Sequence, residues 1–236
     1  MFFFDPIYMI LMLPAFIFMI YAQMKVNSTY QKYSKVANSS GITGLEAAQR
    51  LLQAAGLGGT VRIERTKGQL TDHYDPTKQV LRLSDGVYSG ASVAAVGIVA
   101  HEVGHAVQHQ TGYSMMKVRQ SLVPVANLGS RFGFICLIIG LILYAFGATF
   151  GMTVAWIGVF LFAAAVLFTL VTLPVEFNAS NRARQMLRNL NLVSVQEYNG
   201  ASAVLSAAAM TYVAALWQAV AQLLYFVLLV LRMGRR

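Results

Sequence analysis

The chain has 236 residues, of which 57% are hydrophobic and 11% are charged, and its formal net charge is +9. Soluble globular domains are about one-quarter charged, so this composition excludes an ordinary soluble protein and indicates a membrane protein. The single cysteine, Cys136, lies in an apolar run and excludes a disulfide framework or a zinc site made of cysteines. The basic residues flank apolar segments and do not alternate with stacking aromatic residues, so we expect no nucleic-acid partner.

The first predicted element is a membrane-spanning helix near the N-terminus. No charged residue lies between Pro6 and Met24, and roughly 20 helical residues cross a hydrocarbon core about 30 Å thick. A cleaved signal peptide begins with basic residues, whereas the early charge here is Asp5. We therefore expect residues 1–24 to form a retained transmembrane anchor.

Residues 25–131 have ordinary polarity and predict a small α+β domain. A capping box at 43–46, Thr-Gly-Leu-Glu, opens a helix that Gly56 can close. β-Branched and alternating apolar residues in Thr60–Arg65 and Gln79–Leu83 indicate two strands.

The next 44 residues, 132–175, contain no charge. This length suffices for two spans of roughly 20 residues each, and the glycines in Phe146–Gly151 permit a turn there. We predict a transmembrane hairpin of two helices, 132–149 and 153–173.

After the hairpin, residues 176–212 predict helices that complete a site with the α+β domain. The first of them begins at Pro174 and ends near Asn189, and the second is rich in small residues and begins near Gly200. Residues 213–236 predict a fourth transmembrane segment followed by a basic tail.

The distribution of basic residues predicts the orientation. Fifteen of the eighteen lysines and arginines lie in 25–131 and 182–188, and positive residues favour the cytoplasmic side. We therefore expect a multi-pass protein of the plasma membrane whose N-terminus is outside and whose active site is cytoplasmic. Arg232, Arg235 and Arg236 are exceptions to this rule.

Residues 101–105 read His-Glu-Val-Gly-His and carry the strongest chemical signal. They fall in a helix predicted from about Ser92 to Gln108, where positions four apart lie on one face. Two imidazoles with this spacing can bind one zinc ion, and the adjacent glutamate can act as general base toward an activated water. The alternative is a chance match, but three of the four histidines gather within Ala100–Gln110 on an amphipathic helix.

A third ligand must come from elsewhere in the chain. A metzincin would have glycine at 108 and histidine at 111, where this chain has Gln108 and Thr111. His109 lies about 12 Å along the helix from His101, too far to share the ion. Of the nine acidic residues, Glu176 is the best candidate because it follows the hairpin directly. Its alternative role is that of an acid at a helix start, favoured by the helix dipole.

Four runs of residues carry a family resemblance: Asp-His-Tyr-Asp-Pro (72–76), Leu-Arg-Leu-Ser (81–84), Ala-His-Glu-Val-Gly-His-Ala-Val-Gln (100–108) and Leu-Pro-Val-Glu-Phe-Asn-Ala-Ser (173–180). Over most of its length the chain resembles the YugP-like membrane zinc metallopeptidases, and more distantly the HtpX-type membrane peptidases. The resemblance implies that one zinc ion is bound by His101, His105 and Glu176. It also implies that Glu102 is the general base.

The chain departs from the HtpX pattern at one position. That group has an aspartate four residues after the ligand glutamate, where it supports the first histidine, whereas this chain has Ser180 followed by Asn181. A neutral group can still hydrogen-bond an imidazole and fix its tautomer, but it raises the basicity of the ligand less than a carboxylate does. We therefore expect weak or conditional activity.

Three other residues are weaker candidates for a role in catalysis. His73, Tyr74 and Tyr212 could stabilise a developing oxyanion, but a solvated turn or packing at a membrane interface is the better explanation for each, so we assign this role to none of them. The predicted strand at 79–84 could bind an extended peptide by β-augmentation.

Together these patterns predict a mainly α-helical integral-membrane protein with about four transmembrane helices and a small α+β zincin-like catalytic domain. The predicted function is that of a zinc metalloendopeptidase that cleaves proteins or peptides at the surface of the lipid bilayer. The alternative is a membrane scaffold with a structural zinc site, in which Glu102 would have no use. A transporter is disfavoured because the hairpin contains no charged residue. The sequence leaves the oligomeric state open.

Overall fold

The structure, a computed structural model, describes residues 5–234. Among these residues the chain divides into two compact units. The first unit comprises residues 5–21, 117–173 and 212–234, and the second comprises 22–116 and 174–211. Arg235 and Arg236, which the sequence places in the basic tail, lie outside the described residues.

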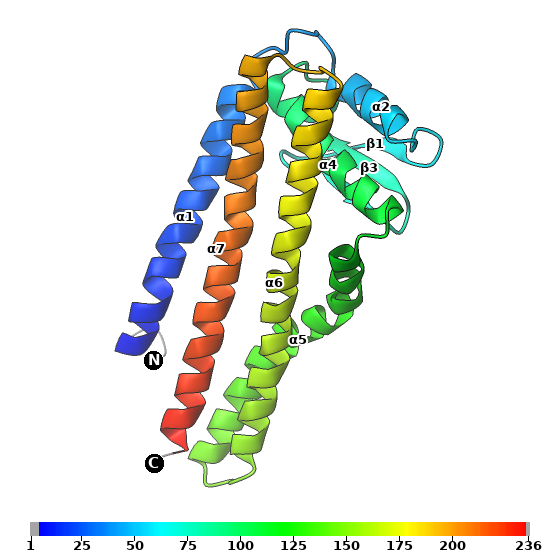
Figure 1. The fold of residues 1–236 in the computed structure, drawn as a ribbon. Helices are drawn as coiled ribbons and strands as arrows, with labels where there is room; N and C mark the ends of the chain where they lie inside the picture. Colours follow the sequence, from blue (N-terminus) through cyan, green and yellow to red (C-terminus); the bar gives the residue numbers. More distant parts are fainter. Residues whose placement is uncertain (1–4, 235–236) are drawn as a thin grey trace. The chain divides into compact units, whose positions relative to one another are not determined.

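Four helices of the described chain are long and apolar enough to cross a membrane (Figure 1): α1 (Pro6–Tyr33), α5 (Ser114–Ala145), α6 (Gly151–Asn189) and α7 (Val195–Met233). Each is longer than the span predicted from the sequence, because its polar end continues as helix beyond the apolar stretch. The prediction of a mainly helical membrane protein with about four such helices and a small α+β unit is confirmed.

Within the first unit, α5 and α6 form a hairpin whose turn lies at residues 146–150. Glycines bring the two backbones into contact. A Cβ atom added to Gly140 would lie 2.2 Å from Ala155 N, and one added to Gly158 would lie 2.4 Å from Leu137 N. In a membrane there is little hydrophobic force between helices, so close backbone packing of this kind holds them together.

Two predicted helix boundaries are wrong. We expected a new helix at Pro174, but α6 continues through this proline to Asn189. A proline in a helix removes one backbone hydrogen bond and costs about 3 kcal/mol. The burial of apolar residues that follow it, Val175, Ala179 and Ala183, opposes this cost. Likewise, no separate helix begins near Gly200, because α7 is continuous from Val195 to Met233.

The start of α7 shows why its boundary lies upstream of Gly200. Ser194 N–H donates to Glu197 Oε2 at 2.7 Å, and Glu197 N–H donates to Ser194 Oγ at 3.3 Å. This reciprocal pair is a capping box, in which a serine and a glutamate three residues apart satisfy each other's free N–H groups. The pattern is visible in the sequence and marks the true N-terminus of the helix.

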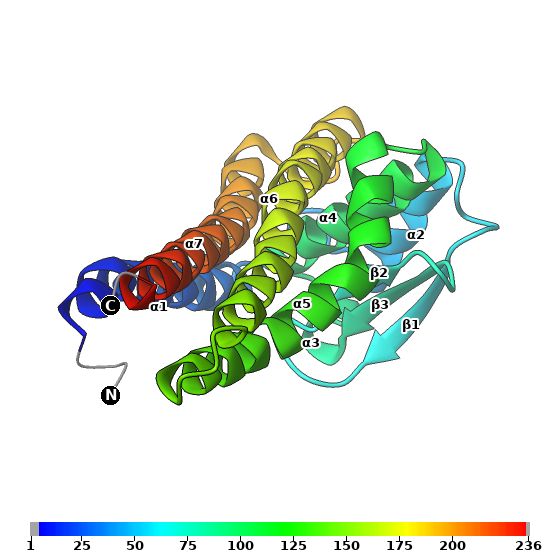
Figure 2. The same cartoon turned by 90° about the horizontal axis from the view of Figure 1, so that it is seen from below.

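The second unit contains a three-stranded sheet and three shorter helices (Figure 2): β1 (Arg62–Thr66), β2 (His73–Asp75), β3 (Val80–Ser84), α2 (Gly44–Ala54), α3 (Asp85–Tyr88) and α4 (Val93–Gln110). The strand order is β1-β3-β2, with β1 parallel and β2 antiparallel to β3. The predicted strands correspond to β1 and β3. The strand β2 was not predicted, because three residues in a polar run are too few to show alternation.

The position of β3 corrects one functional prediction. Its central residue Arg82 is paired with Glu64 of β1 on one side and with His73 of β2 on the other. A strand that is paired on both sides has no free row of backbone groups for another strand. The prediction that residues 79–84 bind an extended peptide by β-augmentation is therefore wrong.

The predicted capping box of α2 is confirmed. Thr43 Oγ1 accepts the Glu46 N–H at 3.2 Å, and Glu46 Oε2 accepts the Thr43 N–H at 2.7 Å. Gly56 follows the helix with a φ of +72°, a conformation that glycine adopts without strain. The helix packs its buried face, including Leu51 and Leu52, into the same core as the apolar residues of α4.

Candidate metal centre

The helix that carries the His-Glu-Val-Gly-His motif lies in the middle of the core of the second unit. Its N-terminus is defined by Ser92, whose Oγ accepts the Ala95 N–H at 3.2 Å. The helix is buried on nearly all sides, so the prediction of an amphipathic helix is wrong, and α4 is a core helix that is apolar around most of its circumference. Its buried polar residues Glu102, His105 and Gln108 therefore need polar partners, since an unpaired polar group in a core is costly.

Gly104 brings α4 into contact with the part of α6 that follows Pro174. A Cβ atom added to Gly104 would lie 2.6 Å from Ala179 O, so the two backbones touch. From this contact the helices run antiparallel. One turn further along α4 is Gln108, and its Nε2 donates at 2.7 Å to the carbonyl of Val175, one turn back along α6.

This register places Glu176 opposite the two histidines. His101 Nε2 lies 3.2 Å from Glu176 Oε2, and His105 Nε2 lies 3.4 Å from the same oxygen. The three candidate ligand atoms are all within 4.8 Å of one another, and no other cluster of this kind was found in residues 5–234. The Glu176 side chain is 2% exposed, whereas those of His101 and His105 are 12% and 10% exposed. The two histidines therefore keep some contact with solvent, whereas the carboxylate does not.

The donor atoms fit a zinc ion. Two imidazole nitrogens and one carboxylate oxygen, directed at a common point, match the set of three protein ligands that leaves a coordination position open in catalytic zinc sites. The two imidazole rings are nearly perpendicular, with centroids 4.8 Å apart, so both can present Nε2 to one ion. The alternative role of Glu176 as a helix-start acid does not hold, because residue 176 lies inside α6.

The other nitrogen of each imidazole contacts a neutral side chain. His101 Nδ1 lies 3.2 Å from Ser180 Oγ, and His105 Nδ1 lies 3.0 Å from Gln108 Oε1. Ser180 thus occupies the place where the HtpX pattern has aspartate, while Asn181 accepts a hydrogen bond from Arg184 instead. The sequence patterns assigned no role to Gln108 beside His105. Its spacing of three residues from His105 is the signal that it shares a helix face with that ligand.

Glu102 lies beside the cluster and is held by the sheet. Its Oε2 accepts the backbone N–H of Tyr74 in β2 at 3.0 Å. Burial raises the pKa of the Glu102 carboxyl, and the two histidines oppose this shift only in part. A raised pKa brings a carboxylate closer to the range in which a general base works efficiently near neutral pH. The sequence did not reveal the contact with Tyr74, because β2 was not predicted.

The remaining candidates have other contacts. His109 Nδ1 lies 3.0 Å from Tyr74 Oη and does not belong to the metal cluster, as predicted from its distance along the helix. His73 is exposed, with Nδ1 2.8 Å from the carbonyl of Thr71. Tyr212 belongs to the first unit. None of these contacts assigns an oxyanion stabiliser.

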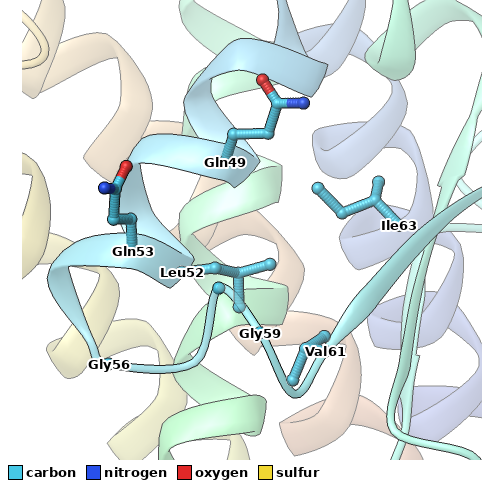
Figure 3. Close-up of a pocket in the computed structure, with 8 residues that line it drawn as sticks. Gln49, Leu52, Gln53, Gly56, Gly59, Val61 and Ile63 are labelled. Carbon is cyan, nitrogen blue, oxygen red and sulfur yellow. The ribbon is translucent and has the colours of Figure 1, made fainter.

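A large cavity of the second unit is separate from this cluster. It has a volume of about 510 Å³ and lies between the end of α2 and β1 (Figure 3), lined by Gln49, Leu52, Gln53, Gly56, Gly58, Gly59, Val61 and Ile63. Its lining contains no carboxylate, histidine or cysteine. Among the described residues, the candidate metal ligands therefore lie at the α4–α6 contact and not in this cavity.

Comparison with known proteins agrees with this geometry. Residues 8–231 match the model of a family described as "Putative neutral zinc metallopeptidase". The chain is 46% identical over 211 residues to "Putative membrane protease YugP" of Bacillus subtilis (strain 168), which covers 89% of this chain and 91% of that protein. No solved structure matches the chain. Because the matches extend over nearly the whole length, the chain belongs to the neutral zinc metallopeptidase family.

Proposed function

We propose that the chain is a membrane-bound zinc metalloendopeptidase in which His101, His105 and Glu176 are the zinc ligands. The observation that carries this proposal is the convergence of His101 Nε2 and His105 Nε2 on Glu176 Oε2, at 3.2 and 3.4 Å. Membership of a zinc metallopeptidase family supports the choice of metal. The similarity to a protein named as a membrane protease supports proteins or peptides as substrates.

Bound zinc would supply a Lewis acid that polarises the scissile carbonyl and lowers the pKa of the attacking water. Glu102 would act as general base. Because its Oε2 already accepts the Tyr74 N–H, we assign Oε1 to take the proton from the attacking water. The same carboxyl would then deliver that proton to the leaving amine as the peptide bond breaks, which returns Glu102 to its starting state.

The experiment that tests this function compares the wild-type chain with Glu102→Gln. Both are purified in detergent at full length, and their zinc content and cleavage of casein are measured. We expect one zinc per chain in both and cleavage by the wild type alone, because glutamine keeps the shape of the side chain but cannot accept the proton. Glu64→Gln, at a carboxylate paired with Arg82 on the sheet, is the matched control and should cleave casein normally.

The other outcomes have defined meanings. If neither protein contains zinc after metal supplementation, the proposed metal centre is wrong. If both contain zinc and neither cleaves any of several protein substrates, a membrane scaffold with a structural zinc site replaces the peptidase. The position of Glu102 between the two histidines in the motif favours the peptidase, because a structural zinc site has no use for a base beside its ligands.

The proposed setting is the plasma membrane, with the active site on the cytoplasmic side. The support is the concentration of lysine and arginine in 25–131 and 182–188. Lys67→Cys in a Cys136→Ser background, expressed in intact cells, tests the orientation. We expect a membrane-impermeant maleimide to label residue 67 only after the cells are permeabilised. Labelling in intact cells would place the second unit outside.

A further inference from the structure

Gln108 is the most deeply buried polar side chain next to the metal cluster, with no exposed surface. Its amide makes three hydrogen bonds. Oε1 faces His105 Nδ1 at 3.0 Å, and Nε2 donates to Val175 O at 2.7 Å and to Asn178 Oδ1 at 3.0 Å. A buried polar network whose atoms are all hydrogen-bonded holds its members in fixed orientations. The donor and acceptor roles in these three bonds determine how the Gln108 amide is oriented toward His105.

The orientation of the Gln108 amide follows from partners that cannot reverse their roles. A backbone carbonyl only accepts, so the Gln108 atom that faces Val175 O must be the NH₂ group. The guanidinium of Arg182 only donates, and its Nε lies 2.8 Å from Asn178 Oδ1. The Asn178 atom that faces Gln108 is thus an oxygen, and it too requires the NH₂ group. Two independent partners therefore direct Gln108 Oε1 toward His105.

This orientation determines which nitrogen of His105 carries the proton. An amide oxygen only accepts, so His105 Nδ1 must donate its hydrogen to Gln108 Oε1. In the neutral imidazole the other nitrogen then carries a lone pair. That nitrogen is Nε2, which lies 3.4 Å from Glu176 Oε2 and points into the metal cluster.

We propose that Arg182, Asn178 and Gln108 form a chain of hydrogen bonds that holds His105 in its Nδ1–H tautomer, with Gln108 as the positioning residue for this zinc ligand. The inference rests on the proposed function, because it takes His105 as a ligand. It adds that the ligand is prepared for metal by a neutral amide rather than by a carboxylate. His101 lacks such a constraint, because the Ser180 hydroxyl can donate or accept.

The test measures zinc affinity of the full-length protein in detergent by competition with a chelator, together with thermal unfolding. Gln108→Met keeps the length of the side chain but removes the acceptor for His105 Nδ1–H. We expect it to weaken zinc binding by about 10- to 100-fold, the range found when such supporting partners are lost. Gln108→Glu keeps an acceptor for His105 but loses both donors to α6. It should unfold at a lower temperature than the wild type and still bind zinc more tightly than Gln108→Met.

Asn38→Ala is the matched control. Asn38 is also a buried side-chain amide that makes two backbone hydrogen bonds, both to Ile42, and it contacts no residue of the cluster. We expect it to lower the unfolding temperature and to leave zinc affinity unchanged. The inference is overturned if Gln108→Met binds zinc as tightly as the wild type, or if the affinities of the variants simply follow their unfolding temperatures. A wild type that binds no zinc overturns the proposed function as well, so the two failures are distinguishable.

Discussion

The helix α6 packs in two different ways along its length. In residues 151–173 it meets α5 through glycines, with a Cβ on Gly158 only 2.4 Å from the Leu137 backbone. In residues 174–189 it meets α4 through one glycine, Gly104, and around that contact lie polar side chains that bond across the two helices. Both regions bring backbones together, but only the second uses the short distance to place functional groups.

The two kinds of packing differ because lipid and the core of the second unit stabilise different contacts between helices. Helices in lipid gain from close van der Waals contact between backbones, and polar side chains there are expensive. In the second unit the apolar core around α4 makes each unpaired polar group costly, so the buried polar groups bond to one another. Close contact thus stabilises helix packing in residues 151–173 of α6, whereas in residues 174–189 it positions the candidate metal ligands.

The largest contrast is expected from two substitutions one turn apart on α6. Glu176→Gln removes a proposed ligand charge and should weaken zinc binding by more than about 100-fold, beyond the effect of losing a supporting partner. Thr172→Val removes a buried hydroxyl that donates to its own helix at Phe168 O, and zinc affinity should not change. Zinc titration of both variants by chelator competition makes the comparison. Equal affinities would contradict the assignment of Glu176.

Alanine substitutions of the contact glycines distinguish packing that only stabilises the fold from packing that also positions the metal ligands. Gly140→Ala and Gly104→Ala each force a Cβ into backbone atoms closer than 3 Å, and overpacking of this kind costs about 1–3 kcal/mol of stability. We expect both to lower the unfolding temperature. Only Gly104→Ala should also weaken zinc binding, because it moves α6 away from His101 and His105.

Gly97→Ala supplies the control on α4 itself. Its Cβ would meet Ala201 Cβ at 3.2 Å and Ala201 Cα at 3.4 Å, contacts that a small shift of the neighbouring backbone relieves. Zinc affinity of this variant should equal that of the wild type. If Gly104→Ala also retained full affinity, the α4–α6 contact would not be what aligns the ligands.

A smaller effect is expected at Ser180. Ser180→Ala removes the hydroxyl that contacts His101 Nδ1 and should weaken zinc binding by about 10-fold, the lower end of the range for supporting partners. Ser180→Asp supplies the carboxylate of the HtpX pattern, which raises the basicity of the imidazole, and should tighten binding relative to Ser180→Ala. Isothermal titration with zinc measures both. An unchanged affinity in Ser180→Ala would show that His101 needs no support.

The smallest effect concerns acid stability at the sheet, away from both helix contacts. Backbone N–H groups, chiefly that of Lys78, and the Arg82 side chain hold the pKa of Asp75 below its ordinary value. A lowered pKa contributes stability above the ordinary pKa of about 4, which is lost as the pH falls through the folded-state value. Asp75→Asn should therefore unfold slightly more easily at neutral pH, and the difference from wild type should vanish in strong acid. Thermal unfolding across this pH range checks the prediction, and at neutral pH the zinc affinity of Asp75→Asn should equal that of the wild type.

Much of the fold was predictable because the signals are local. The capping box at Thr43 and Glu46 and the four apolar helices each depend on neighbours within a few turns, and each is confirmed. Predictions failed where distant contacts decide. Pro174 indicates a boundary locally, but burial of the following turn keeps α6 continuous. The short strand β2 exists because β3 pairs with it, and three residues alone show no pattern.

The sequence by itself determined that His101 and His105 share a helix face with Glu102 beside them, because helical periodicity alone sets that relation. It also suggested Glu176 from its place after the hairpin. Tertiary structure decided the rest. The contact of Gly104 with Ala179 sets the register that brings Glu176 to both histidines, and it also brings Gln108 to Val175 and Asn178. This register depends on how the surfaces of α4 and α6 fit together, and these helices are some 70 residues apart in the chain. No local sequence pattern encodes that fit.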